Sequence, residues 1–154
     1  MARSKSFITA RSLTIEEQIL RMQSVCPWFK LRRVRRQVEV TWIGEVRPTP
    51  LCDLYTVSLR HRTNWCPEVR VQSPALRIRQ GAKSLPHIYR DGSLCLHTLS
   101  DWQPSRFVAD YVVPWISTWL YFYEVWFATG VWIAGGTHPE KPEHCDQLNI
   151  ERTW

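Results

Sequence analysis

The sequence lacks several patterns that mark common classes of protein. Its five cysteines form no C-x-x-C pair, which argues against a disulfide framework or a zinc ribbon and predicts a reducing, cytoplasmic setting. It has no P-loop and no G-x-G-x-x-G, so neither phosphate-binding loop is present and no cofactor is expected. The N-terminal stretch MARSKSFITARSLT has positive charges but no apolar core, so we do not expect a signal peptide.

A membrane span is also disfavoured. The run from Tyr111 to Ala134 carries one charge, Glu124, and is long enough to cross a bilayer. However, Pro114 interrupts the run near its start, and its Trp and Tyr are spread along it instead of gathering at two interfaces. We therefore expect a buried core helix here and no membrane partner.

Positive charge is concentrated in the first part of the chain. Residues 1–94 hold 17 Lys and Arg against 7 Asp and Glu, whereas residues 95–154 hold 3 against 7. A basic segment of this kind can bind nucleic acid, a membrane surface or an acidic protein. The simpler interpretation is an exposed basic face that keeps a chain with nine tryptophans soluble. We therefore do not expect a nucleic-acid partner.

Periodicity predicts one helix and then a sheet. Thr14 and Glu17 fit a capping box ahead of a helix of about twelve residues that Pro27 ends. Alternating apolar residues then mark strands beginning near Val38, Tyr55 and Val69, with turn signals at 47–50 and 63–67. The arginines of 32–36 are interpreted as an exposed lead-in to the first of these strands. Strands with such short connections predict an antiparallel meander.

A second helix is predicted after an irregular segment at 81–105. Its apolar side chains form two adjacent stripes, and Gly130 is the expected cap. The stripes are Trp115, Trp119, Phe122 and Trp126, and Ile116, Leu120, Tyr123 and Phe127. The fold class is therefore α+β, with helices packed against one sheet. We expect one domain over residues 1–145 and a flexible tail over residues 146–154.

The segment SLPHIYRDGSLCLHTLSDW, residues 84–102, holds the candidate chemistry. A thiol becomes a nucleophile only as a thiolate, and polar or cationic neighbours favour that form. Cys95 has His87 eight residues before it, His97 two after it and Asp101 nearby. A cysteine between two leucines is also often a small buried hydrophobe, so these residues alone leave both interpretations open. The histidine and cysteine spacing matches no common zinc pattern, and no metal is expected.

The same segment resembles the active-site region of ubiquitin-conjugating enzymes, which have the UBC fold. Leu85, Pro86 and His87 occupy the place of the His-Pro-Asn triplet, GSLCL matches the cysteine loop, and DWQP matches the Trp-x-Pro that follows. With the run PWISTWLYFYEVWFATGVWIAGGTHP, the chain is similar to prokaryotic ubiquitin-conjugating-like proteins of CBASS antiphage operons. Those proteins are encoded beside cGAS-like nucleotidyltransferases.

The resemblance implies a UBC-like fold and acyl transfer. Cys95 would carry the C-terminus of a cGAS-like nucleotidyltransferase as a thioester and pass it to a lysine of an acceptor protein. An activating enzyme, or an already activated donor, would come from elsewhere. His97 and Asp101 would be candidates for deprotonating the acceptor amine. His87 stands where the family usually has asparagine, and it could donate to the oxyanion, act as a general base or only pin the loop.

The resemblance also implies C-terminal aromatic-rich helices after the active-site loop. An alternative from another class stays open: a non-catalytic UBC-fold binding module that holds and scaffolds the nucleotidyltransferase.

Overall fold

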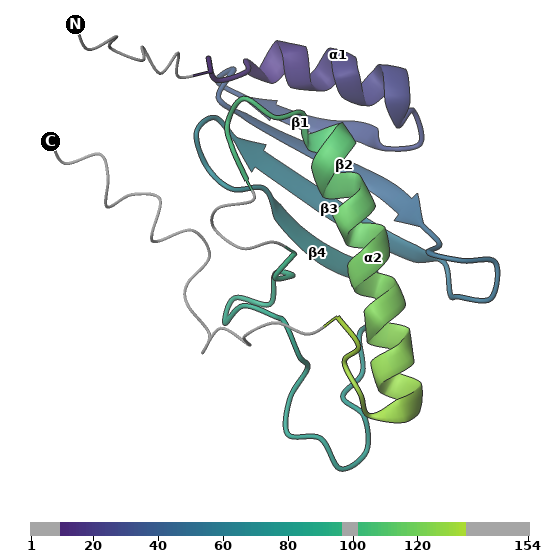
Figure 1. The fold of residues 1–154 in the computed structure, drawn as a ribbon. Coiled ribbons are helices and arrows are strands. Elements are labelled where there is room, and N and C mark those ends of the chain that lie inside the picture. The colour runs from purple at the N-terminus through teal and green to yellow at the C-terminus, as the bar shows by residue number, and fades with distance from the viewer. Residues whose placement is uncertain (1–9, 97–101, 135–154) are drawn as a thin grey trace, which may run out of the picture.

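The structure, a computed structural model, describes residues 10–96 and 102–134 and consists of two helices and one sheet. Helix α1 (Ile15–Val25) is followed by strands β1 (Lys30–Arg35), β2 (Glu39–Val46), β3 (Tyr55–Arg62) and β4 (Glu68–Ser73), and then by helix α2 (Val108–Thr129). The strands pair antiparallel in the order β1-β2-β3-β4 (Figure 1). The predicted α+β class and the antiparallel meander are confirmed.

Helix α1 begins with the predicted capping box. The Thr14 side chain accepts from the Glu17 N–H, and the Glu17 carboxylate accepts from the Thr14 N–H. The helix also buries Gln18, which periodicity did not mark. Its side-chain amide donates to the Arg106 carbonyl at 2.9 Å and accepts from the Val108 N–H at 2.9 Å. One glutamine therefore satisfies the otherwise unpaired start of α2 and joins the two helices.

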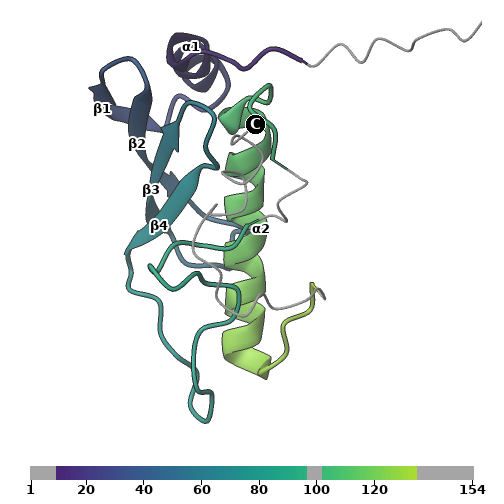
Figure 2. The same ribbon diagram turned by 90° about the vertical axis from the view of Figure 1, so that its left-hand side faces the viewer.

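The sheet has a covered face and an open face, as the alternating burial of β2 and β3 shows. Helix α2 runs across the covered face in both views (Figures 1 and 2). The core side chains of that face include Val40, Trp42, Val57 and Leu59, each at most 1% exposed. The Phe29 ring lies so close to Gly44 that an added Cβ would come within 2.6–2.7 Å of it. Glycine is therefore required where the chain before β1 crosses the sheet.

One expectation about the sheet is wrong. The arginines of 32–36 do not lead into the strand that contains Val40; residues Lys30–Arg35 form a separate edge strand, β1. All six of its residues are exposed, so its sequence carries no alternation of apolar and polar positions. Arg36 and Gln37 form the turn to β2 with φ of 50° and 55°. The predicted meander therefore has four strands and not three.

Helix α2 contains most of the aromatic run and begins at Val108, just after the irregular segment predicted at 81–105. Pro114 lies inside it and does not end it. The predicted cap is confirmed: Gly130 has φ of 81°, and its N–H donates to the Trp126 carbonyl at 2.7 Å. In the described ranges one helix follows the irregular segment, where the resemblance implied more than one. No helix among the described residues has the length and apolar character needed to cross a membrane.

Candidate active site around Cys95

Residues 87–95 form a tight hairpin, which we call the Cys95 hairpin. The Cys95 N–H donates to the His87 carbonyl at 2.9 Å, and the Tyr89 N–H donates to the Ser93 carbonyl at 2.8 Å. The turn closes through the Gly92 N–H, which donates to the Tyr89 carbonyl at 2.9 Å. Gly92 has φ of 86°, a conformation that glycine adopts without steric cost. This register places Tyr89 and Cys95 as diagonal neighbours on one face of the hairpin.

The hairpin is held against strand β4. The Leu94 N–H donates to the Val69 carbonyl at 2.9 Å. At the turn, the Asp91 carboxylate accepts from the Ser93 N–H at 2.9 Å and from the Ser93 hydroxyl at 2.6 Å. Arg70 of β4 pairs with the same carboxylate at 3.3 Å and also donates to the Asp91 carbonyl. Both ends of the turn are therefore fixed, which gives Cys95 a defined position beside the sheet.

The Cys95 thiol is free and half-buried. Burial raises its pKa above the ordinary value, and a hydrogen bond with the Tyr89 side chain acts in the opposite direction. The pKa of Tyr89 is raised as well, first by its own burial and then by its bond with Cys95. The Tyr89 hydroxyl can therefore stabilise the Cys95 thiolate by hydrogen bonding to it. Sequence reasoning missed Tyr89, although the turn at Gly92 was a signal for this pairing.

His87 contributes its backbone and its ring to different contacts. Its carbonyl accepts from the Cys95 N–H and from the Trp119 indole N–H, at 2.9 and 3.0 Å. Its φ is 49°, a conformation uncommon for residues other than glycine. The imidazole stacks on Trp132, with ring centres 4.7 Å apart and planes 25° apart. Trp132 also contacts Trp119 edge to face at 5.5 Å. No motif or spacing in the sequence indicates that Trp132 packs against this loop.

His97 and Asp101, the other two predicted site residues, lie outside the described residues. Trp102 follows them and is buried, with its indole N–H donating to the Trp65 carbonyl at 3.2 Å. Its ring meets His61 edge to face at 5.7 Å. Burial lowers the pKa of His61 to about 4, and its Nδ1 has no hydrogen-bond partner among the described residues. His61 is therefore a neutral core histidine and not an acid or base of this site.

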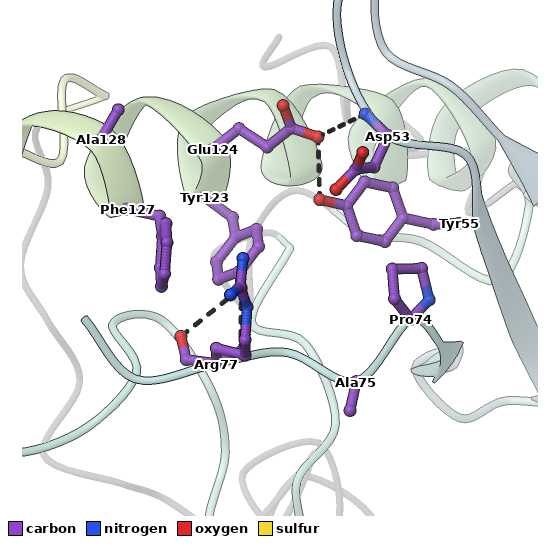
Figure 3. Close-up of a pocket in the computed structure, with 9 residues that line it drawn as sticks. All are labelled: Asp53, Tyr55, Pro74, Ala75, Arg77, Tyr123, Glu124, Phe127 and Ala128. Carbon is purple, nitrogen blue, oxygen red and sulfur yellow. Dashed lines mark hydrogen bonds between the residues drawn. The ribbon is translucent and has the colours of Figure 1, made fainter. Parts of the chain in front are cut away.

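A separate pocket of about 560 Å³ lies between α2 and the start of β3 (Figure 3). The Glu124 carboxylate projects from the helix and accepts from the Asp53 N–H and from the Tyr55 hydroxyl, each at 2.8 Å. The Arg77 guanidinium lies 4.5 Å from the centre of the Phe127 ring. These contacts tie two loops to α2 and explain the single charge in the aromatic run. No residue of the Cys95 hairpin lines this pocket.

Comparison with models of known protein families identifies a match for most of the chain. Residues 18–139 match the family model E2-CBASS, described as Type II CBASS E2 protein. The matched range includes the whole sheet, the Cys95 hairpin and α2. No curated protein matches the chain. The order of helix, four-stranded antiparallel sheet and helix is consistent with an E2-like protein.

Proposed function

The chain belongs to the family of Type II CBASS E2 proteins, and from this premise we propose that Cys95 carries an activated protein C-terminus as a thioester and transfers it to an amine. The observation that carries the proposal is the Cys95 hairpin. It presents a free, half-buried thiol that the Tyr89 side chain hydrogen-bonds, at a backbone position fixed by hydrogen bonds. We also propose that the two helices and the sheet are those of a UBC-like domain extending to residue 145.

In the first step, Cys95 Sγ attacks the carbonyl carbon of an activated C-terminus. The S–C bond forms as the bond to the activating group breaks, and that group leaves with its electron pair. The thiol must lose its proton to solvent or a base before the attack, because the thiolate is the nucleophile. The Tyr89 hydroxyl stabilises the developing thiolate, while partial burial keeps most of the resting thiol protonated.

In the second step, a lysine amine of the acceptor attacks the thioester carbonyl. The C–N bond forms and the C–S bond breaks. The released Cys95 thiolate again accepts a hydrogen bond from the Tyr89 hydroxyl. The amine loses a proton, and His97 and Asp101 are our candidates for accepting it. A thiolate is a good leaving group, so correct placement of the amine accounts for much of the catalysis of this transfer step.

For His87 we propose the positioning role among the three that the sequence allowed. Its carbonyl receives two N–H groups, one of them from Cys95 itself. Its ring is stacked on Trp132, which holds the imidazole in one orientation. Both contacts support a role for His87 in fixing the shape of the Cys95 hairpin.

The proposed donor is the C-terminus of a cGAS-like nucleotidyltransferase from the same CBASS system, acting in the cytoplasm. Its transfer to an acceptor would regulate cyclic-nucleotide signalling during infection. The chain has no P-loop with which to make an acyl-adenylate, so the donor must arrive activated or meet a separate activating enzyme.

The test is to trap the adduct during co-expression with the neighbouring nucleotidyltransferase. The native protein should show a covalent species that thiols cleave, and Cys95→Ser should show an ester that thiols leave intact. Cys52→Ser is the matched control, because Cys52 is also free and partly buried but hydrogen-bonds only with Thr49 in the described structure. It should behave like the native protein. Absence of any adduct in both the native protein and Cys95→Ser would refute the proposal.

The raised pKa of the Cys95 thiol favours a second candidate, a non-catalytic module that holds the nucleotidyltransferase. In that case the two proteins would co-purify without a covalent bond. Thiols would then leave the complex unchanged, and Cys95→Ser would bind as well as the native chain.

A further inference from the structure

Strand β1 and its turn form a strongly cationic border of the molecule. Five cations lie within seven consecutive residues, and all of them are exposed. We call this set the cationic edge: Lys30, Arg32, Arg33, Arg35 and Arg36. Such a density of one charge, exposed along an extended segment, is a favourable site for an acidic partner.

The pairing register separates the side chains of β1 by face. Arg33 and Arg35 stand opposite Thr41 and Glu39, whose side chains lie on the open face of the sheet. Arg32 falls at an irregularity in the register and, with Lys30, lines a shallow pocket of about 600 Å³ on that face.

The apolar residues of the strand lie on the other side. Leu31 and Val34 stand opposite Trp42 and Val40, on the covered face. They remain 42% and 37% exposed. The strand therefore presents charge on one face and incompletely covered apolar groups on the other.

Among the described residues, no acidic side chain forms a salt bridge with the cationic edge. In the described ranges, the salt bridges of the arginines involve Arg11, Arg21, Arg60 and Arg70, and none involves the cationic edge. Glu39 stands opposite Arg35 without forming an ion pair. Like charges packed this closely repel one another, so binding an acidic segment would relieve that repulsion as well as add attraction.

Within the described part of the chain, the outer edge of β1 is also open for hydrogen bonding. β1 pairs with β2 on one side, and no described strand lies on its other side. The Cys95 hairpin contacts β4, the opposite border of the sheet. Three strand spacings of about 4.8 Å separate β1 from β4, so the two sites lie at least ~14 Å apart. A partner bound to β1 would leave Cys95 accessible.

From these observations we infer that β1 binds an extended acidic segment of a partner protein, which pairs with it as a fifth strand. The segment would alternate acidic residues, facing the cations of the open face, with apolar residues facing Leu31 and Val34. A protein strand is favoured over a nucleic acid, because the edge offers unpaired backbone groups and apolar side chains together with charge. This inference goes beyond the proposed thioester chemistry and does not depend on it.

The experiment measures fluorescence anisotropy of the full chain with a labelled peptide of about seven residues that alternates glutamate and valine. We expect saturable binding that weakens when salt is raised from about 0.05 to about 0.5 M. The same peptide with alternate backbone nitrogens methylated cannot pair as a strand, and it should not bind. A peptide of the same composition with its glutamates grouped at one end should bind weakly.

Variants locate the site. Arg33→Glu with Arg35→Glu should weaken peptide binding at least about tenfold. Arg47→Glu with Lys83→Glu changes the net charge equally at two exposed positions outside the cationic edge and should change binding less than about twofold. Cys95→Ala should bind as the native chain does, which separates this test from that of the thioester.

Three results would overturn the inference. Methylated and unmethylated peptides could bind equally, which would show attraction without strand pairing. A single-stranded oligonucleotide could bind more tightly than the peptide and depend on the same arginines. The charge-reversed variant could bind normally but self-associate, which would mean that the arginines only protect an exposed strand edge.

Discussion

His61 gives the most quantitative prediction, because it is 2% exposed and has an unpartnered nitrogen in the described structure. Its ring lies against Trp102, and burial lowers its pKa from 6.5 to about 4. The change to make is His61→Phe, which keeps an aromatic ring beside Trp102 and removes the titrating group. Phenylalanine also removes the buried nitrogen, whose desolvation costs about 1–3 kcal/mol. The variant should therefore be at least as stable as the native protein at pH 7.5.

The pH dependence follows from the direction of the shift. Above about pH 6.5, His61 is neutral in both states and contributes no dependence. As pH falls from 6.5 towards 4, the unfolded state takes up a proton that the folded state does not, so stability is lost. Between pH 7.5 and pH 5 this linkage costs about 2 kcal/mol. The carboxyl pKa of Glu17 is lowered from 4.5 to about 2, so its contribution to stability is lost mainly below about pH 4.5, outside this window.

The assay is urea unfolding followed by tryptophan fluorescence at pH 7.5 and pH 5.0, at constant ionic strength. The native protein should lose about 2 kcal/mol more than His61→Phe on acidification. The other four histidines are present in both proteins, so their contributions cancel in this difference. His87→Asn is the matched control and should retain the full His61 contribution. Equal losses in the native protein and His61→Phe would refute the assignment of a buried neutral histidine.

Three further predictions concern the hairpin and the turn after β1. Tyr89→Phe removes the hydrogen bond that lowers the pKa of Cys95, so alkylation of Cys95 by iodoacetamide at pH 8, measured by peptide mass spectrometry, should slow about threefold or more. A rate equal to that of the native protein would contradict the hydrogen bond. His87→Asn and His87→Ala should each transfer acyl groups within about tenfold of the native rate in single-turnover assays, whereas loss of about a hundredfold in both would indicate a general base. Arg36→Asn with Gln37→Gly should stabilise the fold by about 1 kcal/mol in thermal unfolding, because both residues have positive φ; unchanged or lower stability would show that the turn is not strained.

The elements that bury one face were predictable from sequence. Thr14 and Glu17 marked the start of α1, and the alternation in β2 and β3 reflects a sheet with one covered face. Strand β1 was not predictable in the same way. All its residues are exposed, and its sequence has no alternation of apolar and polar residues that would mark a strand. Sequence periodicity reports burial, and an edge strand with little burial gives almost no signal.

The site was predictable in part for a different reason. The motif drew attention to Cys95 and His87 as candidates, but the contacts that surround them join residues that are distant in sequence. Trp132 stacks on His87, and Trp119 donates to the His87 carbonyl. Neither contact follows from local spacing, because each depends on how α2 and the residues after it fold back over the hairpin. The contact of Tyr89 with Cys95 could have been predicted from the sequence, because a turn at Gly92 fixes the register that places the two residues near each other.

The departure from asparagine at His87 now has a physical explanation. The hairpin needs a residue that accepts φ near 49° and offers its carbonyl to Cys95 and Trp119. Asparagine and histidine are both enriched in this region of backbone space, so either can meet the first requirement. The second requirement concerns the backbone alone and is independent of the side chain. Asparagine and histidine are therefore both compatible with the hairpin backbone, and in this chain the imidazole packs against Trp132.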